Sequence, residues 1–275
     1  MDINLSIRWL PDEAQPAHDL ARRVATLVFD SGHLWRLYRD RRGDWTFHFA
    51  SDHFGTRPYK VAQLSRDFSS GVVLVDRRAS YHGQVDPLEY PLDELLWIHW
   101  LATRASIELH ACGVVQSGAG SGGGGYVFVG QSGAGKTTTA RQWARHPAFQ
   151  VLSDDRIIVR RDQRGFSLHG TPWHGEGRFA RPDSARLEGI FLLTQAAHTE
   201  VRTLSPAVAL SRLMAASFPV FHDHALLSAT TDTVVAMVET VPFYELRFTP
   251  DASVVTTVLD HVRRGTQASV QGPTP

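Results

Sequence analysis

The chain has 275 residues, 43% of them hydrophobic and 20% charged, and this length allows one large core or two smaller ones. Basic and acidic residues number 28 each, so there is no basic surplus to favour a nucleic-acid or anionic-membrane partner. The single cysteine, Cys112, excludes an internal disulfide framework. Because the sequence shows neither a signal-peptide pattern nor an apolar run of membrane-spanning length, we expect a cytoplasmic protein with no nucleic-acid or membrane partner.

The first part of the chain, residues 1–88, is typical of short strands joined by turns. Aromatic and β-branched residues predict strands over 34–40 and 45–51, and the RRGD between them favours a hairpin. Residues 58–64 and 71–76 predict two more strands. Since this part has no cluster of catalytic residue types, we expect a small β-rich accessory domain.

The composition changes near residue 88, where we predict a domain boundary. Residues 86–106 begin with prolines and acids and continue with apolar residues spaced by three or four, which predicts a helix. A strand over 107–115, a glycine-rich loop over 116–125 and a strand over 126–129 follow. That loop contains QSGAG without a lysine and is predicted to be a flexible hairpin loop.

The sequence QSGAG occurs again at residues 131–135, and here a lysine follows it. Gly130, Gly135, Lys136 and Thr137 occupy every fixed position of the Walker A pattern, between a predicted strand and a predicted helix that ends at Pro147. Such a loop points backbone N–H groups at phosphate oxygens, while the lysine binds the outer phosphates and the threonine binds Mg²⁺. The alternative is a glycine-rich turn with a chance lysine.

The pattern therefore predicts binding of ATP and Mg²⁺. The residues expected to hold the nucleotide are Gly130, Ser132, Gly133, Ala134, Gly135, Lys136, Thr137 and Thr138.

Two adjacent carboxylates, Asp154 and Asp155, follow the Walker A lysine in FQVLSDDRIIVRRD (149–162). One predicted strand (149–152) leads into them and another (157–161) leaves them. Two acids at a strand end near a bound triphosphate suit one metal-associated carboxylate and one base beside an acceptor hydroxyl. The alternative is a solvated acidic turn before a hairpin.

Walker A with SGAGK, followed by an apolar pair and DDR, resembles the HPr kinase/phosphorylase family. The segment LHACGVV (109–115) is similar to that family's histidine segment, and ARLEGIFLL (185–193) partly matches its second signature. The resemblance covers roughly residues 90–250. It implies an α/β fold: an HPr-kinase/phosphoenolpyruvate-carboxykinase-like P-loop domain over 89–264, beside the β-rich N-terminal domain over 1–88.

The resemblance also implies roles for individual residues. Asp154 would be the general base, His110 would interact with that carboxylate, and Asp155 would lie beside the metal. Lys136 would hold phosphate at the catalytic centre. Arg186 would line the active site.

Where the family has a metal-binding glutamate, this chain has Ser184, and we expect Glu176 to replace it. Glu176 lies in HGTPWHGEGRFARP (169–182), which also contains Arg178 and Arg181. Glycines and prolines in this segment favour a lid near the phosphates, with an ordinary irregular connection as the alternative. The expected metal ligands are Thr137, Asp155 and Glu176.

The last part of the chain predicts helices over 206–217 and 225–239, a strand over 242–248 and a helix over 252–262. The polar tail, 265–275, is predicted to be disordered. His222 and His224 flank Asp223 and are predicted to face solvent rather than bind a metal, and Cys112 is predicted to be a small buried hydrophobe.

From these features we expect an ATP- and Mg²⁺-dependent kinase that phosphorylates a hydroxyl, first of all a serine of a peptide or small protein. The alternatives are a regulatory P-loop ATPase with water as the acceptor, or a nucleotide-binding module without catalysis. Whether the chain forms a homo-oligomer stays open.

Overall fold

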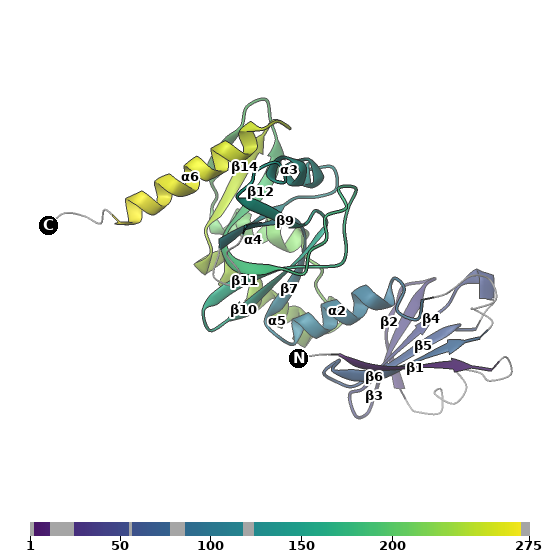
Figure 1. Ribbon diagram of the computed structural model, residues 1–275. Helices are drawn as coiled ribbons and strands as arrows, with labels where there is room; N and C mark the ends of the chain where they lie inside the picture. The colour runs from purple at the N-terminus through teal and green to yellow at the C-terminus, as the bar shows by residue number, and fades with distance from the viewer. Residues whose placement is uncertain (1–2, 12–24, 55–56, 78–85, 118–123, 271–275) are drawn as a thin grey trace. The chain divides into compact units, whose positions relative to one another are not determined.

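The computed structural model describes residues 3–11, 25–54, 57–77, 86–117 and 124–270 (Figure 1). The chain divides into two compact units, and each is described by itself. The first comprises Met1–Thr103 with Phe221–His224, and the second comprises Arg104–Val220 with Ala225–Pro275. Both units combine helices with β-sheet, so the expected mixed α/β class is confirmed. Among the described residues, no helix has the length and apolar character that crossing a membrane requires.

The first unit is built on a sheet that has six strands among the described residues, in the order β1-β6-β5-β4-β3-β2. All neighbouring strands are antiparallel except β1 and β6. The strands predicted at four places correspond to β3 to β6. The strands are β1 (Asn4–Leu10), β2 (Ala25–Asp30), β3 (Trp35–Asp40), β4 (Trp45–Phe49), β5 (Lys60–Leu64) and β6 (Ser70–Asp76), and a short 3-10 helix, η1, covers Asp52–Phe54.

Helix α2 (Leu92–Ala102) belongs to this first unit, and the boundary predicted near residue 88 is therefore wrong. Its buried residues include Leu92, Leu95 and His99. The imidazole of His99 lies 4.6 Å from the ring of Phe68 and 5.5 Å from that of Phe47. The composition change marks the start of α2. This helix packs its apolar side chains into the core of the first unit.

His99 is fully buried and forms a hydrogen bond with His222, with 2.8 Å between the two Nε2 atoms. Its Nδ1 lies 2.6 Å from the carbonyl oxygen of Leu95, which can only accept, so the His99 proton is on Nδ1. The Nε2–H of His222 consequently donates to His99. The prediction that His222 faces solvent is wrong, because its ring also packs 5.5 Å from that of Phe29.

The second unit is built on a larger sheet in which the described residues form eight strands, in the order β11-β10-β7-β8-β12-β14-β13, with β9 paired to β7. Strands β8, β12 and β14 run parallel. Because β11 pairs with both β10 and β12, this part of the sheet curls into a ring. The strands are β7 (Ser106–Gln116), β8 (Gly124–Val129), β9 (Phe149–Ser153), β10 (Arg156–Asp162), β11 (Gly165–Gly170), β12 (Ser184–Gln195), β13 (Glu200–Thr203) and β14 (Phe243–Phe248).

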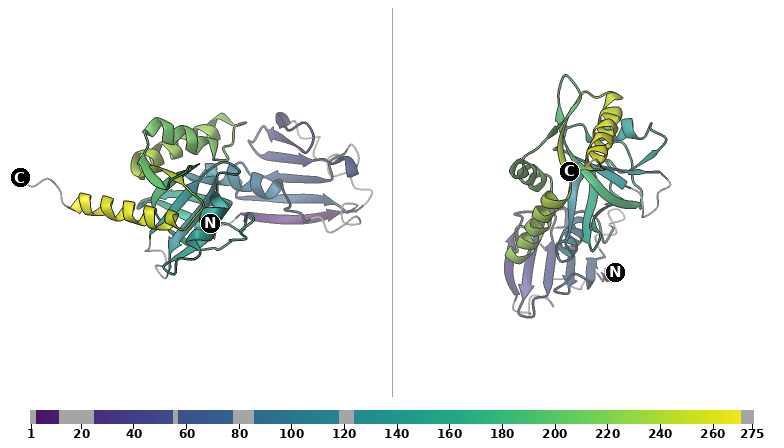
Figure 2. Two further views of the ribbon diagram at one scale, coloured as in Figure 1. Left: turned by 90° about the horizontal axis from the view of Figure 1, so that it is seen from above. Right: turned by 90° about the vertical axis from the view of Figure 1, so that its left-hand side faces the viewer.

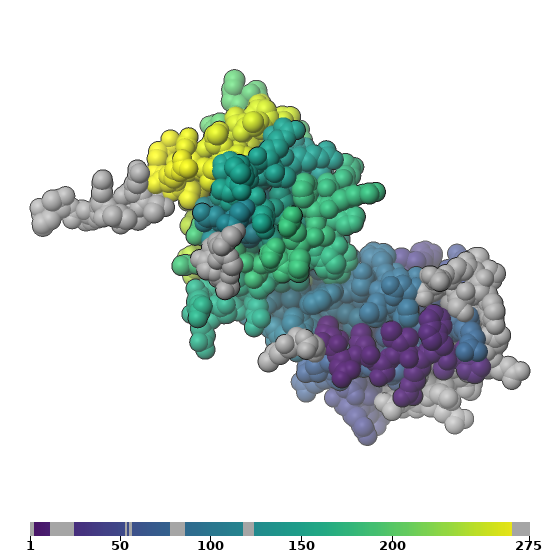
Figure 3. Space-filling model, in the orientation of Figure 1, coloured from purple at the N-terminus to yellow at the C-terminus, as the bar shows by residue number. Residues whose placement is uncertain are grey.

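Side-chain alternation along these strands creates two hydrophobic cores. Val127 and Val129 of β8 join the core that includes residues of α4 (Pro206–Ala215) and α5 (His224–Thr240). Tyr126 and Phe128 join the core that includes residues of α3 (Lys136–Trp143) and α6 (Ser253–Val270). Figure 2 shows α4 and α5 in green on one side of the sheet and α6 in yellow on the other. Helices α3 and α6 are in contact at the surface (Figure 3).

Several sequence predictions for this unit differ from the structure at element ends. Helix α6 continues to Val270, so the tail predicted to be disordered from residue 265 is helical up to that point, and residues 271–275 lie outside the described residues. Strands β11, β12 and β13 lie outside the predicted elements, and of these β11 and β13 are short with few apolar residues. The predicted loop over 116–125 falls between β7 and β8, and most of it lies outside the described residues.

The histidine pair makes the first unit sensitive to acid. Burial, followed by the neighbouring His222, lowers the pKa of His99 to about 3, and burial also lowers the pKa of His222. Below about pH 6.5 the unfolded chain binds protons that the folded unit does not, so the free energy of unfolding should fall as pH falls, by about 1.4 kcal/mol per pH unit for His99, with His222 acting in the same direction. Guanidinium denaturation at pH 7, 6 and 5 measures this slope. His99→Phe should flatten it and exposed His33→Gln should not; an unchanged slope in His99→Phe would contradict this origin.

Candidate functional site

The glycine loop, residues 130–135, follows the fully buried β8 and leads directly into α3. Gly133 and Gly135 have positive φ angles of 79° and 102°, a region that side chains with a Cβ avoid. A Cβ on Gly135 would come within 2.6 Å of the Phe248 ring, whereas one on Gly133 would meet nothing within 4 Å. The loop therefore curls tightly against the core on one side and is open on the other.

Lys136, the first residue of α3, extends its side chain back to the carbonyl oxygens of the glycine loop. Its Nζ donates hydrogen bonds to the carbonyl oxygens of Gly130, at 2.9 Å, and Gln131, at 3.0 Å. The side chain is buried, and burial lowers the pKa of its ammonium, while the charges of Asp155 and Asp154 act in the opposite direction. A buried cation held by carbonyl oxygens can turn to an anionic ligand that enters the loop.

The amino end of α3 is free to bind an anion. Its N-cap, Gly135, offers no side-chain acceptor, and the first turn contains no acidic residue. The first N–H groups of a helix have no partner within the helix and carry the positive end of its dipole. Together with the open side at Gly133, they form a cradle that fits a phosphate chain.

Asp154 is fixed by three hydrogen bonds and is almost completely buried, at 1% exposure. Its Oδ2 accepts from the Thr137 hydroxyl at 3.0 Å and from the Gly177 N–H at 2.8 Å. Its Oδ1 accepts from the Gly175 N–H at 2.9 Å. Because all three hydrogen bonds end on this one carboxyl group, Asp154 is a structural link between α3 and the loop of residues 171–183 rather than a free base.

His110 pairs with Asp155 and not, as predicted, with Asp154. Its Nε2 lies 3.2 Å from Asp155 Oδ1, and both side chains are partly exposed. The reason is the register of β7 and β10, in which His110 is directly opposite Arg156 and the N–H of Ala111 donates to the Asp155 carbonyl. The hydrogen bond from His110 holds the pKa of Asp155 below its ordinary value, so this carboxylate is ionised at neutral pH.

The turn that separates the two acids is held by Ser153. Its Oγ accepts hydrogen bonds from the N–H groups of Asp155 and Arg156, and it donates to the carbonyl oxygen of Trp173. The side chain of Arg156 continues away from the turn, with its Nε 3.0 Å from the buried Glu108 carboxylate and its guanidinium 4.1 Å from the centre of the Phe218 ring. This turn, residues 153–156, is the acid turn, and it is held by Ser153 at its start and by Arg156 at its end.

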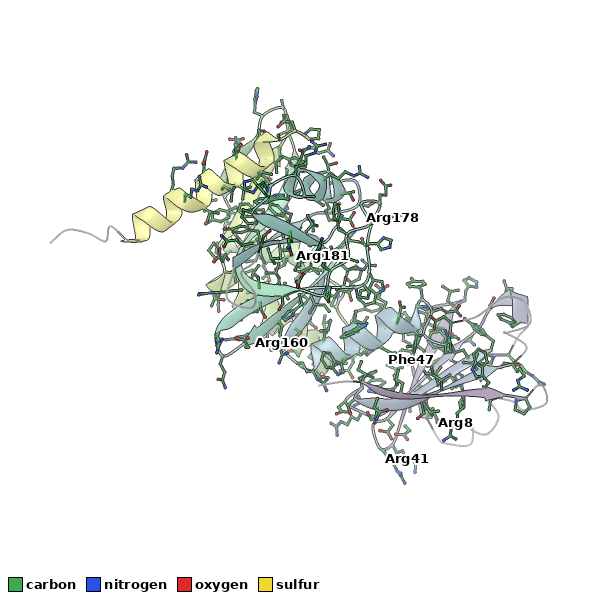
Figure 4. All side chains as sticks on the ribbon, viewed as in Figure 1. Arg8, Arg41, Phe47, Arg160, Arg178 and Arg181 are labelled. Carbon is green, nitrogen blue, oxygen red and sulfur yellow. The ribbon has the colours of Figure 1, made fainter. Side chains whose placement is uncertain are left out.

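The loop of residues 171–183 lies along this acid turn. Its glycines touch Asp154, and the N–H of Arg181 donates to the carbonyl of Leu152 at 2.8 Å. Glu176 and Arg178 alternate with the glycines and are exposed, and Arg178 has a positive φ of 57°. Figure 4 shows Arg178 and Arg181 on this loop. The predicted lid segment and the predicted acids therefore meet in the second unit.

Arg186 does not line this site, which corrects the prediction. In the register of β12 and β8 it lies opposite Gly124, at the start of β8, whereas the glycine loop follows the end of that strand. The nearby Glu188 accepts a hydrogen bond from the Tyr126 hydroxyl at 3.2 Å, again at the far end. The matching residues in the sequence do not show the direction of β12 relative to the glycine loop.

The arrangement of Thr137 and Asp154 fits a divalent cation better than the predicted set with Asp155. The Thr137 hydroxyl donates its proton to Asp154, which leaves its oxygen lone pairs for a hard cation beside the glycine loop. Asp155 is engaged with His110 instead, and Glu176 is exposed on the loop. Among the described residues there is no group of three or more histidine, cysteine or acidic side chains arranged to hold a metal ion, so a cation here would also need oxygens of a phosphate ligand.

A hollow of about 500 Å³ lies beside the glycine loop. Two polar residues that the sequence did not indicate form part of its wall, Gln195 at the end of β12 and Arg212 in α4. The Gln195 amide donates to the carbonyl oxygen of Gly133 at 2.8 Å. The remaining lining residues are Val129 to Ala134, Leu192, Leu193, Ala215 and Ala216. No local pattern marks a glutamine or an arginine in these elements as functional.

No model of a known protein family and no curated protein matches this chain.

The contact between Asp154 and the loop leads to a test. A Cβ on Gly177 would come within 2.7 Å of Asp154 Oδ2, so Gly177→Ala should displace the loop from the acid turn. We expect trypsin to cleave after the exposed Arg178 about tenfold faster, since losing the hydrogen bond that Asp154 accepts would destabilise the closed loop by about 1–3 kcal/mol.

Gly189→Ala is the matched control, because a Cβ there would meet its neighbours only at ordinary contact distances of 3.7 Å and more. Equal cleavage of both variants and the unsubstituted chain would contradict the role assigned to Asp154.

Proposed function

We propose that this chain is an ATP- and Mg²⁺-dependent kinase, similar to the HPr kinase/phosphorylase family, that transfers the γ-phosphoryl group to a hydroxyl. The observation that carries the proposal is that two adjacent carboxylates differ in burial and in hydrogen-bond partners. Asp154 is buried and bonded to Thr137, while Asp155 is partly exposed and bonded to His110. A metal-organising acid and an acceptor-activating acid are the two groups that phosphoryl transfer requires next to a phosphate cradle.

Thr137 would hold Mg²⁺ directly, with Asp154 aligned behind it. The cation, when bound, neutralises charge on the outer phosphates. Lys136 would leave the carbonyl oxygens of Gly130 and Gln131 and bind the phosphate oxygens, and the N–H groups at the start of α3 would receive the remaining negative charge. These contacts fix the phosphate chain so that its terminal group faces the acid turn.

Asp155 would orient the acceptor hydroxyl and receive its proton. The hydroxyl oxygen forms a bond to the terminal phosphorus, the bond from that phosphorus to the bridging oxygen breaks, and ADP leaves with the bond electrons. The lowered pKa keeps Asp155 ionised, and His110 holds its other oxygen. A weak base suffices because catalysis of phosphoryl transfer depends mainly on position and electrostatic stabilisation.

The resemblance to the HPr kinase/phosphorylase family supports a seryl hydroxyl as the acceptor. Because the first unit does not resemble that family's N-terminal domain, we infer a peptide or small protein other than HPr as the substrate. The first unit would then contribute to binding this substrate. A nucleotide-dependent ATPase with water as the acceptor is the other outcome that the experiment below separates.

The decisive experiment incubates the chain with γ-labelled ATP, Mg²⁺ and seryl peptides. Asp155→Asn keeps the shape of the site but cannot take a proton, so we expect label transfer to fall by about 10²–10⁴-fold with an unchanged Mg²⁺ requirement. Asp154→Asn should instead raise the Mg²⁺ concentration needed for half-maximal rate.

Asp162→Asn, at the end of β10, is the control and should behave like the unsubstituted chain. Label that appears only in inorganic phosphate would support the ATPase, and an unaffected Asp155→Asn would refute the proposed base.

Nucleotide binding is tested separately from transfer. Lys136→Ala removes the cation that lies inside the glycine loop, and we expect the dissociation constant for Mg²⁺·ATP to rise at least about tenfold, because a charge-assisted hydrogen bond to phosphate contributes about 1.5–3 kcal/mol. Titration calorimetry on the full chain measures this. Arg145→Ala, at the end of the same helical region, should bind ATP normally; equal affinities of all three proteins would contradict the assignment of the loop.

A further inference from the structure

Arg212 lies in the last turn of α4 and lines the hollow beside the glycine loop. Its side chain is about one-third exposed. It donates to the Glu245 carboxylate at 3.0 Å, to the Leu193 carbonyl at 3.0 Å and to the Thr194 hydroxyl at 3.1 Å. The side chain is therefore fixed in one orientation at the ends of β12 and β14.

Two N–H groups of the Arg212 guanidinium are not used by these hydrogen bonds. Of its five N–H groups, the three bonds above use one on Nη1 and two on Nη2. The Nε–H and the second Nη1–H have no partner among the hydrogen bonds of the described residues. A planar cation with two unused donors at the wall of an open hollow can donate to a phosphate oxygen.

The end of β12 connects this guanidinium to the glycine loop. The Thr194 hydroxyl donates to the Glu245 carboxylate at 2.8 Å. It therefore helps to fix the carboxylate with which Arg212 is paired. The next residue, Gln195, donates to the Gly133 carbonyl. Although burial acts to raise the pKa of Glu245, the hydrogen bonds from Thr194 and Arg212 hold it below the ordinary value, so the pair is ionised at neutral pH. The arginine is thus set at a fixed place relative to the loop.

One residue of the hollow's wall also contacts the strand that carries His110. Ala216, one turn after Arg212, lines the hollow, and its carbonyl oxygen accepts the N–H of His110 at 2.8 Å. The segment that carries Arg212 therefore lies between the glycine loop and the strand of His110.

We propose that Arg212 is a catalytic residue that contacts the terminal phosphate of a nucleoside triphosphate held in the glycine loop. It supplies a second cation from the wall facing the loop, where Lys136 supplies the first, and stabilises the negative charge on the phosphoryl group during transfer. This inference rests on the proposed function. It adds that the site distinguishes a triphosphate from a diphosphate, because the diphosphate lacks the group that Arg212 contacts.

Titration calorimetry of the full chain with Mg²⁺·ATP and Mg²⁺·ADP tests the proposal. Arg212→Gln should weaken ATP binding about tenfold and ADP binding by less than about twofold, because only the triphosphate loses a charge-assisted contact. Arg212→Lys keeps the charge but cannot make the planar network, and should weaken ATP preferentially as well. It serves as the second variant if the glutamine variant fails to fold.

Arg247→Gln is the matched control, since Arg247 lies on the same strand as Glu245 and pairs with Glu200. It should leave the ratio of ATP to ADP affinity unchanged. Loss of ATP and ADP affinity in equal measure, or no change in either Arg212 variant, would overturn the role of Arg212.

The outcomes separate this inference from the proposed function. If the unsubstituted chain binds ATP tightly but labels no hydroxyl, the kinase proposal fails while the affinity ratio still decides the role of Arg212. If the unsubstituted chain does not bind ATP, the role of Arg212 is refuted together with the phosphate cradle.

Discussion

The buried carboxylate of Asp154 holds the candidate site together. It accepts hydrogen bonds from Thr137 on α3 and from the N–H groups of Gly175 and Gly177, so one side chain connects the helix after the glycine loop with the loop of residues 171–183. A buried polar group is tolerated only when its hydrogen-bonding atoms have partners, and removing one partner is costly. The close approach also explains the two glycines, because a Cβ at either position would collide with the carboxylate.

The neighbouring Asp155 has the opposite environment although it is the next residue in the chain. Its carboxylate lies on the side of β7 that carries His110, partly open to solvent, while Asp154 faces α3. The turn held by Ser153 separates the two side chains. Two groups of the same chemistry can take different tasks when burial and partners differ, which is the physical basis for assigning metal organisation to one and acceptor activation to the other.

Positive charge surrounds the glycine loop from two directions. Lys136 is held inside the loop by carbonyl oxygens, and Arg212 is held in the facing wall by Glu245 and Thr194. Arg212 is held in place before any ligand arrives, which would reduce the reorganisation on binding an anion, whereas Lys136 would exchange its carbonyl partners for that anion. The hydrogen bonds of Arg212 leave two of its N–H groups for a ligand.

The sequence by itself determined the features that depend on local chemistry. A buried strand, a glycine loop with lysine and threonine, and a helix follow from spacing alone, because glycine permits the backbone angles at Gly133 and Gly135 and the apolar pattern shows the strand. The presence of two acids at the end of β9 was predictable for the same reason.

Only the tertiary structure decided which groups meet. The register of β7 against β10 places His110 beside Asp155. The direction of β12 places Arg186 at the end of β8 that is far from the glycine loop. The packing of His99 shows that α2 belongs to the first unit. Arg212 reaches the hollow because the last turn of α4 lies beside the end of β12, where Arg212 donates to the Leu193 carbonyl. Such pairings depend on residues far apart in the chain, and no local periodicity encodes them.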